Sequence, residues 1–164
     1  MSTLTTYPIH PGDRLQRRLA TILTNDILSI TPLFTGCSVV IDRTDAEQDL
    51  PVIGIRVGET QNIPPGSHVH HIGITIHLME DRQEANDAIS GDTRPRHELR
   101  TENISARLFG IWDGATLDEE INLISDGNGI HVLKIFSQNV AQTPETDYIG
   151  TEWSFTAICV STQQ

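Results

Sequence analysis

The fold is decided by residues 50–80, which read LPVIGIRVGETQNIPPGSHVHHIGITIHLME. Apolar side chains alternate with small or polar ones through both halves of this stretch, at Ile53, Ile55, Val57, Ile72, Ile74, Ile76 and Leu78. Alternation with a period of two is typical of strands that bury one face. Between the halves, Pro64, Pro65 and Gly66 cannot continue a hydrogen-bonded ladder. The stretch therefore predicts a long β-hairpin with a stiffened tip.

A helix is predicted on each side of this hairpin. Before it, apolar residues at spacings of three and four indicate an amphipathic helix that runs from Asp13, as its cap, to about Ser29. After it, a helix is expected from about Thr93 to Trp112, with Pro95 in its first turn. The buried side of this second helix would carry Ile104, Leu108, Ile111 and Trp112.

The remaining segments predict further strands. Residues 37–41 indicate a short strand, and residues 130–136 have apolar side chains on both faces, as a central strand does. Residues 150–160 are expected to form the last strand, with one face made by Trp153, Phe155, Ala157 and Cys159. Residues 117–125 fit a short strand or a helical turn equally well, and residues 139–147 resemble a polar loop.

Together these elements predict a single domain, 1–164, of the α+β class. We expect an antiparallel or mixed β-sheet with two α-helices packed on one face and a long protruding β-hairpin. Residues 1–12 are expected to form a polar N-terminal arm, because two prolines and a glycine disfavour a helix there. Residues 81–94 are polar and are expected to be a loop or insertion, with a helical turn around residues 84–89.

The composition limits the partners of the chain. Its 164 residues carry a net charge of −11, and its sequence pI is near 4.9. Such a surface repels nucleic-acid phosphate and anionic lipid. It suits a basic protein partner, or a ring through which DNA slides without sticking, and it equally suits simple solubility. Because no signal-peptide pattern and no apolar run of ~18 residues is present, we expect a soluble protein made in a cytoplasm, with no membrane partner.

The cysteines and histidines are the residues to test for chemistry. Cys37 and Cys159 are too few for a disulfide framework, and the apolar strand around Cys159 indicates a buried free thiol. His68 and His70 are two residues apart at the start of a strand, a spacing that resembles the metal-binding box of the cupins. That box continues with a glutamate about four residues further on, whereas the next carboxylate here is Glu80. A zinc site needs at least one more ligand, so exposed histidines are the favoured interpretation and no metal is predicted.

No signature of an enzyme is present in the sequence. It contains no Gly-x-Ser-x-Gly elbow, no phosphate-binding loop and no dinucleotide fingerprint. No cysteine has an evident activating neighbour, and no pair of carboxylates can be singled out for acid–base work. We therefore predict no enzymatic activity, no catalytic residue and no cofactor.

In the order of its elements, the chain resembles the tail terminator (tail completion) proteins of tailed bacteriophages. The resemblance covers nearly the full length and is one of pattern, because this family has no short diagnostic motif. The segments that carry it are RLQRRLATILTNDI (14–27), LPVIGIRVGETQ (50–61), HHIGITIHLME (70–80), ELRTENISARLFGIW (98–112) and YIGTEWSFTAICV (148–160).

The resemblance implies a structural virion protein that is assembled in the host cytoplasm. Such proteins form a ring, commonly of six subunits, that caps the tail tube, stops its polymerisation and joins it to the neck. The partners would be other copies of the chain, the tail tube and the neck or connector proteins. DNA would pass through the lumen without specific binding. The alternatives are another neck or tail subunit, such as a connector or tube protein, or a small metal-binding domain that uses His68 and His70.

Two parts of the chain are candidates for interfaces. The hairpin tip is longer than a reversal of direction requires, and its prolines restrict it before binding. Three arginines near the start of the first helix sit unfavourably beside the helix dipole and could grip an acidic neighbour. A solvated basic face is the plainer interpretation of these arginines. The candidate interface residues are therefore Ile63, Pro64, Pro65, Arg14, Arg17 and Arg18.

Overall fold

The computed structural model describes residues 11–29, 33–41, 50–88, 93–110, 115–124, 130–144 and 148–161. In chain order the elements are α1 (Pro11–Ser29), β1 (Ser38–Ile41), β2 (Val52–Asn62), β3 (Val69–Asp81), α2 (Arg82–Asn86), α3 (Arg96–Phe109), α4 (Leu117–Leu123), β4 (Ile130–Pro144) and β5 (Tyr148–Ser161). The strands form one sheet in the order β1-β2-β3-β5-β4, in which only the β1–β2 pair is parallel. The α+β class and the mixed sheet are therefore confirmed.

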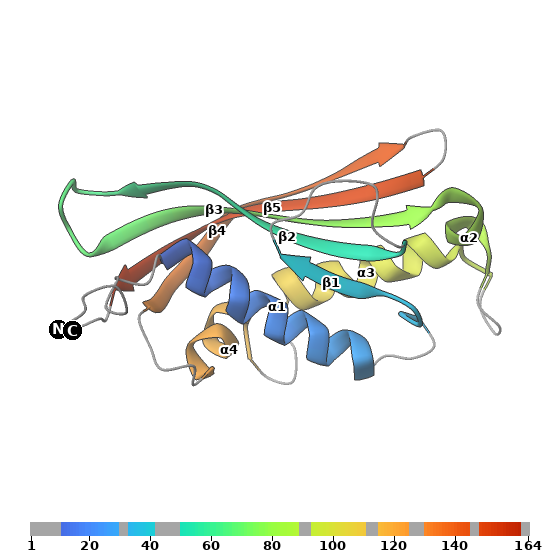
Figure 1. Cartoon of the computed structure of the whole chain (residues 1–164), viewed down its shortest axis with the longest axis horizontal. Helices are drawn as coiled ribbons and strands as arrows, with labels where there is room; N and C mark the ends of the chain where they lie inside the picture. Colours follow the sequence, from blue (N-terminus) through green and yellow to red (C-terminus); the bar gives the residue numbers. More distant parts are fainter. Residues whose placement is uncertain are drawn as a thin grey trace, which may run out of the picture.

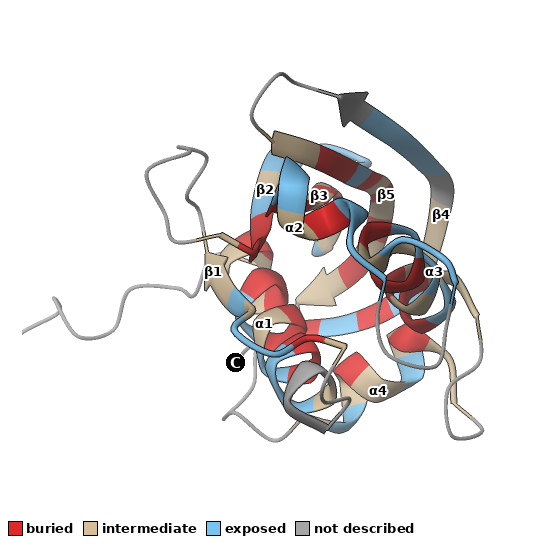
Figure 2. Ribbon diagram, turned by 90° about the vertical axis from the view of Figure 1, so that its right-hand side faces the viewer, coloured by how far each residue is buried: buried red, intermediate tan, exposed pale blue. Residues whose placement is uncertain are grey.

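The helices and the sheet form two layers. Helices α1, α3 and α4 lie on one face of the sheet, and no described helix covers the opposite face (Figures 1 and 2). The prediction of two helices on one face is thus confirmed for α1 and α3, and α4 joins them there. The core between the layers is mostly Ile and Leu, as expected from a chain with 5% aromatic residues.

The central hairpin forms as predicted. Its register places Ile53 opposite Leu78, Ile55 opposite Ile76 and Val57 opposite Ile74, all on the face that meets the helices. A register shift between Val57 and Thr60 interrupts the ladder once. Figure 1 shows the tip of this hairpin projecting at one end of the molecule, beyond the end of α1.

The last strand, β5, lies beside β3 in the interior of the sheet. The face predicted from its alternation is confirmed, because Trp153, Phe155, Ala157 and Cys159 are all buried. Cys159 is a free thiol, and burial raises its pKa to about 12. Such a thiol is unreactive at neutral pH.

The position and length of β4 were predicted wrongly. It was expected to be central and to end near Phe136, but it is an edge strand that continues to Pro144. Most of the segment expected to be a loop is therefore strand, and residues 145–147 lie outside the described residues. A register shift after Val132 turns apolar side chains to both sides of β4 and produced the pattern of a buried strand, and a second shift follows Phe136.

The boundaries of the two long helices also differ from the predictions. α1 begins at Pro11, so Asp13 lies in its first turn and is not the cap, and residues 11–12 do not belong to an arm. α3 begins after Pro95 and ends at Phe109. Residues 1–10 and the predicted core residues Ile111 and Trp112 lie outside the described residues.

Two ambiguous segments are partly helical. The segment around residues 117–125 contains α4, whose Glu119 carboxylate accepts a hydrogen bond of 2.9 Å from the N–H of Thr116. In the expected loop 81–94, Asp81 closes β3 and caps α2, which lies slightly before the predicted turn. Ala85 of α2 is fully buried, so this part of the segment belongs to the core. Residues 89–92 lie outside the described residues.

Candidate interaction surfaces

The hairpin tip is exposed and held in shape by its own hydrogen bonds. Ile63 is 46% exposed, and Pro64 and Pro65 are exposed beside it. The N–H of Ser67 donates to the carbonyl of Pro64 at 3.0 Å, and the side-chain amide of Asn62 donates to the carbonyl of Ser67 at 2.9 Å. The tip therefore presents an apolar side chain on a restricted backbone, which lowers the entropy lost on binding.

The tip also lies in an uncharged part of a strongly charged chain. From Thr60 to Met79 the sequence contains no Asp, Glu, Lys or Arg, although the whole chain has 22 acidic and 11 basic residues. Copies of a protein with a net charge of −11 repel one another. An uncharged arm is where two such copies can approach at the lowest electrostatic cost.

The two histidines considered as metal ligands are placed differently. His70 lies between the Oγ of Ser161, 2.7 Å from its Nε2, and the side-chain nitrogen of Asn62, 3.1 Å from its Nδ1. His68 is exposed, and its carbonyl accepts from the N–H of Ser161 at 2.9 Å. Both residues thus connect the hairpin to the end of β5. Within the described ranges, no three His, Cys, Asp or Glu side chains are grouped closely enough to hold a metal ion.

The three arginines of α1 do not share one accessible face. Arg18 is only 4% exposed, and its Nη1 donates to the carbonyls of Ile130 at 3.1 Å and Ile121 at 3.4 Å. Arg18 is therefore not exposed to a partner in the single copy, because its guanidinium joins α1 to α4 and β4. Arg17 is exposed and pairs with Asp13 at 2.9 Å, and Arg14 is half-buried.

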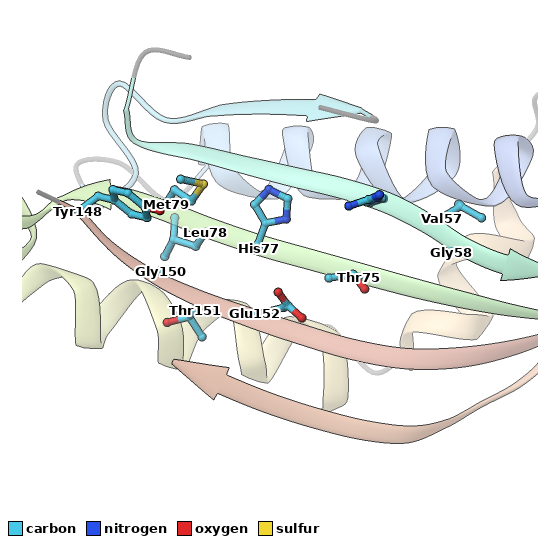
Figure 3. A pocket seen from close by; sticks show the side chains of 11 residues that line it. Val57, Gly58, Thr75, His77, Leu78, Met79, Tyr148, Gly150, Thr151 and Glu152 are labelled. Carbon is cyan, nitrogen blue, oxygen red and sulfur yellow. The ribbon is translucent and has the colours of Figure 1, made fainter. Parts of the chain in front are cut away.

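A shallow groove of about 510 Å³ lies on the face of the sheet opposite the helices. Figure 3 shows His77 in this groove, with Glu152 on the neighbouring strand and Met79 and Tyr148 towards one end. Arg56 of β2 is a further lining residue. The groove thus offers an imidazole, a carboxylate and a guanidinium to a polar partner. The groove was not predicted from the sequence, although the alternation in residues 50–80, which places Arg56 and His77 on the polar faces of their strands, was a usable signal.

The environment of His77 disfavours its charged form. Its ring lies over Gly54, where an added Cβ would overlap the ring. Burial lowers the pKa of His77 below its usual 6.5, the positive charge of Arg56 lowers it further, and the carboxylate of Glu152 opposes both effects. The folded state therefore binds this proton less tightly than the unfolded chain does.

The pKa of His77 predicts a pH dependence of stability. The contribution of His77 to the stability of the fold is complete above its pKa in the unfolded chain, near 6.5. It is lost as the pH falls from there through the lowered pKa of the folded state. We expect His77→Gln to flatten the stability profile in that window, as measured by urea denaturation. In the matched variant Gly54→Ala the new Cβ must push the ring outward, so an NMR titration should show the His77 pKa rising towards 6.5. An unchanged pKa in that variant would contradict burial as the main cause.

A buried cluster of charges joins β3 to α3. Glu80, at the end of β3, and Arg100 are each 1% exposed, and His97 is 4% exposed. One carboxylate oxygen of Glu80 pairs with Nη1 of Arg100, and the other pairs with Nδ1 of His97. Nε2 of His97 lies 2.8 Å from Oγ1 of Thr151. The signal in the sequence was the spacing of three between His97 and Arg100, which places both on one side of a helix.

This cluster has the connectivity of a catalytic triad but not its access to solvent. A carboxylate, an imidazole and a hydroxyl are linked in series, as in enzymes that activate a nucleophile. Thr151, however, is 1% exposed and also lies 3.2 Å from the hydroxyl of Thr101. The Oγ1 of Thr151 is therefore held by neighbouring side chains, and Thr151 is also one of the residues that line the groove. Its ion pairs join the end of β3 to α3 through Glu80, Arg100 and His97.

The described residues contain no helix long and apolar enough to cross a membrane. A comparison with known proteins finds no family model that matches this sequence and no curated protein with significant similarity to it.

Proposed function

We propose that this chain is a structural subunit of a virus particle: a tail terminator that forms a ring, caps the tail tube and joins it to the neck. The resemblance in the order of its elements suggests this class. The observation that carries the proposal is the β2–β3 hairpin, which ends in an ordered, uncharged tip with Ile63 exposed. Exposed apolar residues on a restricted loop are typical of surfaces that contact a partner.

The charge of the chain supports a ring around DNA. Acidic residues outnumber basic ones by 22 to 11, and three of the basic residues, Arg18, Arg100 and Arg107, are buried. A lumen lined by such a surface repels phosphate, so DNA passes without specific binding. The tail tube and the neck or connector would then bind the two rims.

The molecular mass of the purified protein in solution tests whether the chain forms a ring. Light scattering after gel filtration should give a multiple of the 18.2 kDa subunit, six-fold if the resemblance holds, and negative-stain images should show rings. Added to polymerising tail-tube protein, the chain should stop tube growth. Growth that continues past added protein would favour a connector, and tubes formed by this chain alone would favour a tube subunit. A monomer at every concentration, with and without tube protein, would contradict the proposal.

Replacing Ile63-Pro64-Pro65 by Gly-Ser-Gly should weaken assembly and leave the fold unchanged. The tip makes no contribution to the core, so circular dichroism should match that of the original chain. Light scattering should show a shift towards smaller species, because the apolar anchor is gone and the loop must be ordered on binding. The control is Ile63→Val, which keeps a branched apolar side chain and should assemble normally. Equal assembly by all three proteins would place the interface elsewhere.

A further inference from the structure

A second exposed apolar surface lies where α4 meets β4. Leu123 is 78% exposed and Leu133 is 52% exposed. Leu133 also lines a hollow of about 210 Å³ together with Phe109, Leu117 and Ile135. We call these five residues the α4–β4 patch. Large apolar side chains exposed next to a hollow are typical of a binding surface.

The position of α4 against β4 is fixed beside these leucines. The side-chain amide of Asn122 donates to the carbonyl of Val132 at 2.8 Å, and its oxygen accepts from the N–H of Val132 at 2.7 Å. Asn122 precedes Leu123 and Val132 precedes Leu133, so this paired hydrogen bond anchors the backbone next to both leucines. The same bonds occupy the outward edge of β4 at Val132, so another strand cannot pair there. The patch is therefore a preformed surface for side chains.

The hollow itself carries no net charge, although Glu119 and Glu120 follow Asp118 in α4. Asp118 and Lys134 are the charged residues that line the hollow, one of each sign. The chain as a whole carries −11. A second copy of the chain would therefore meet little repulsion at this hollow, provided that the part it brings is also uncharged. Within the described residues, two exposed apolar side chains lie in stretches without Asp, Glu, Lys or Arg: Ile63 on the hairpin tip and Val140 within β4. Ile63 is the one of these two that stands on a projecting loop, where it can reach into a hollow of another copy.

We propose that the α4–β4 patch receives the hairpin tip of a second copy of this chain, with Ile63 seated in the hollow. Ile63 and Leu133 are both exposed in the single copy, so the two do not cover each other within one chain. Because donor and acceptor are different surfaces, each copy gives one tip and accepts one. Such a heterologous contact closes into a ring when the rotation between copies allows it. This inference rests on the proposed ring and names the surfaces that build it.

Disulfide trapping tests the contact directly. In a Cys37→Ser background, in which the remaining Cys159 is fully buried, the variant carrying both Ile63→Cys and Leu133→Cys is oxidised and run on a non-reducing gel. We expect a ladder of cross-linked species up to the ring size. Either single variant can form at most a dimer. The inference would be overturned if the double variant forms rings in solution but gives no cross-linked species larger than a dimer. That result would leave the proposed function standing.

Charge exchange provides a second measurement that does not depend on cysteine geometry. Ile63→Lys and Leu133→Glu should each raise the protein concentration that is needed for half-maximal assembly at least tenfold. The variant that carries both changes should assemble at a lower concentration than either single variant. The matched control is Val140→Glu, a change on the same strand at a residue that is 42% exposed but outside the patch. It should assemble as the original chain does. Equal loss in Leu133→Glu and Val140→Glu, without restoration in the double variant, would contradict a specific contact.

Discussion

Glu80→Ala should lower the free energy of unfolding by about 3–5 kcal/mol, a loss typical of breaking a buried ion pair on one side only. Arg100 is 1% exposed and would lose the carboxylate that its Nη1 contacts. Its remaining partners are neutral: the carbonyl of Leu33, 2.6 Å from its Nε, and the ring of Phe34. His97 would lose the partner of its Nδ1 in the same change.

The size of this effect is best judged against an exposed ion pair that also involves a residue of α3. Glu102 pairs with Arg94 at 2.6 Å, and both side chains are about half exposed. Glu102→Ala should therefore cost less than about 1 kcal/mol. Urea denaturation of both variants should show a lower midpoint for Glu80→Ala with an unchanged slope. Similar midpoints for the two variants would mean that the cluster around Glu80 does little for the fold.

Ile76→Ala should lower the free energy of unfolding by about 2–5 kcal/mol. Ile76 is fully buried in the central strand, opposite Ile55 of β2 on one side and Trp153 of β5 on the other. Neighbours held on both sides by the sheet cannot close the cavity that a smaller side chain leaves. Thr75→Ala, on the opposite face of the same strand, should cost at most about 1 kcal/mol. Thermal and urea unfolding of the two variants measure the difference; equal losses would contradict the assigned face.

The sequence predicts the faces of β3 and β5 because their alternation is unbroken. Each has one face buried and the other partly open, so a period of two in the letters is also a period of two in burial. In β4, by contrast, the alternation in the sequence does not match the alternation in burial. Its register shifts reverse the direction of later side chains, and Leu133 and Val140 remain exposed on an edge. A β-bulge has no sequence pattern by which its exposed apolar residues could be told apart from buried ones.

The surfaces were harder to predict than the strands. The tip could be identified from Pro64 and Pro65, because proline restricts a loop wherever that loop lies. Arg18 could not be placed, because the carbonyls that it binds, at Ile121 and Ile130, are more than 100 positions away in the chain. The pairing of Glu80 with His97 depends on the packing of α3 against the sheet, which no local pattern encodes.

The place of β5 in the sheet has a consequence for the synthesis of the protein. Ile74 of β3 pairs with Phe155 of β5, a separation of 81 positions along the chain. Pairings this distant fold slowly, because a long loop must close before any contact forms. During synthesis on the ribosome, β3 of the isoleucine-rich hairpin can therefore pair with β2 early, but it can pair with β5 only after β5 has been made. During that interval it is open to chaperones and to aggregation.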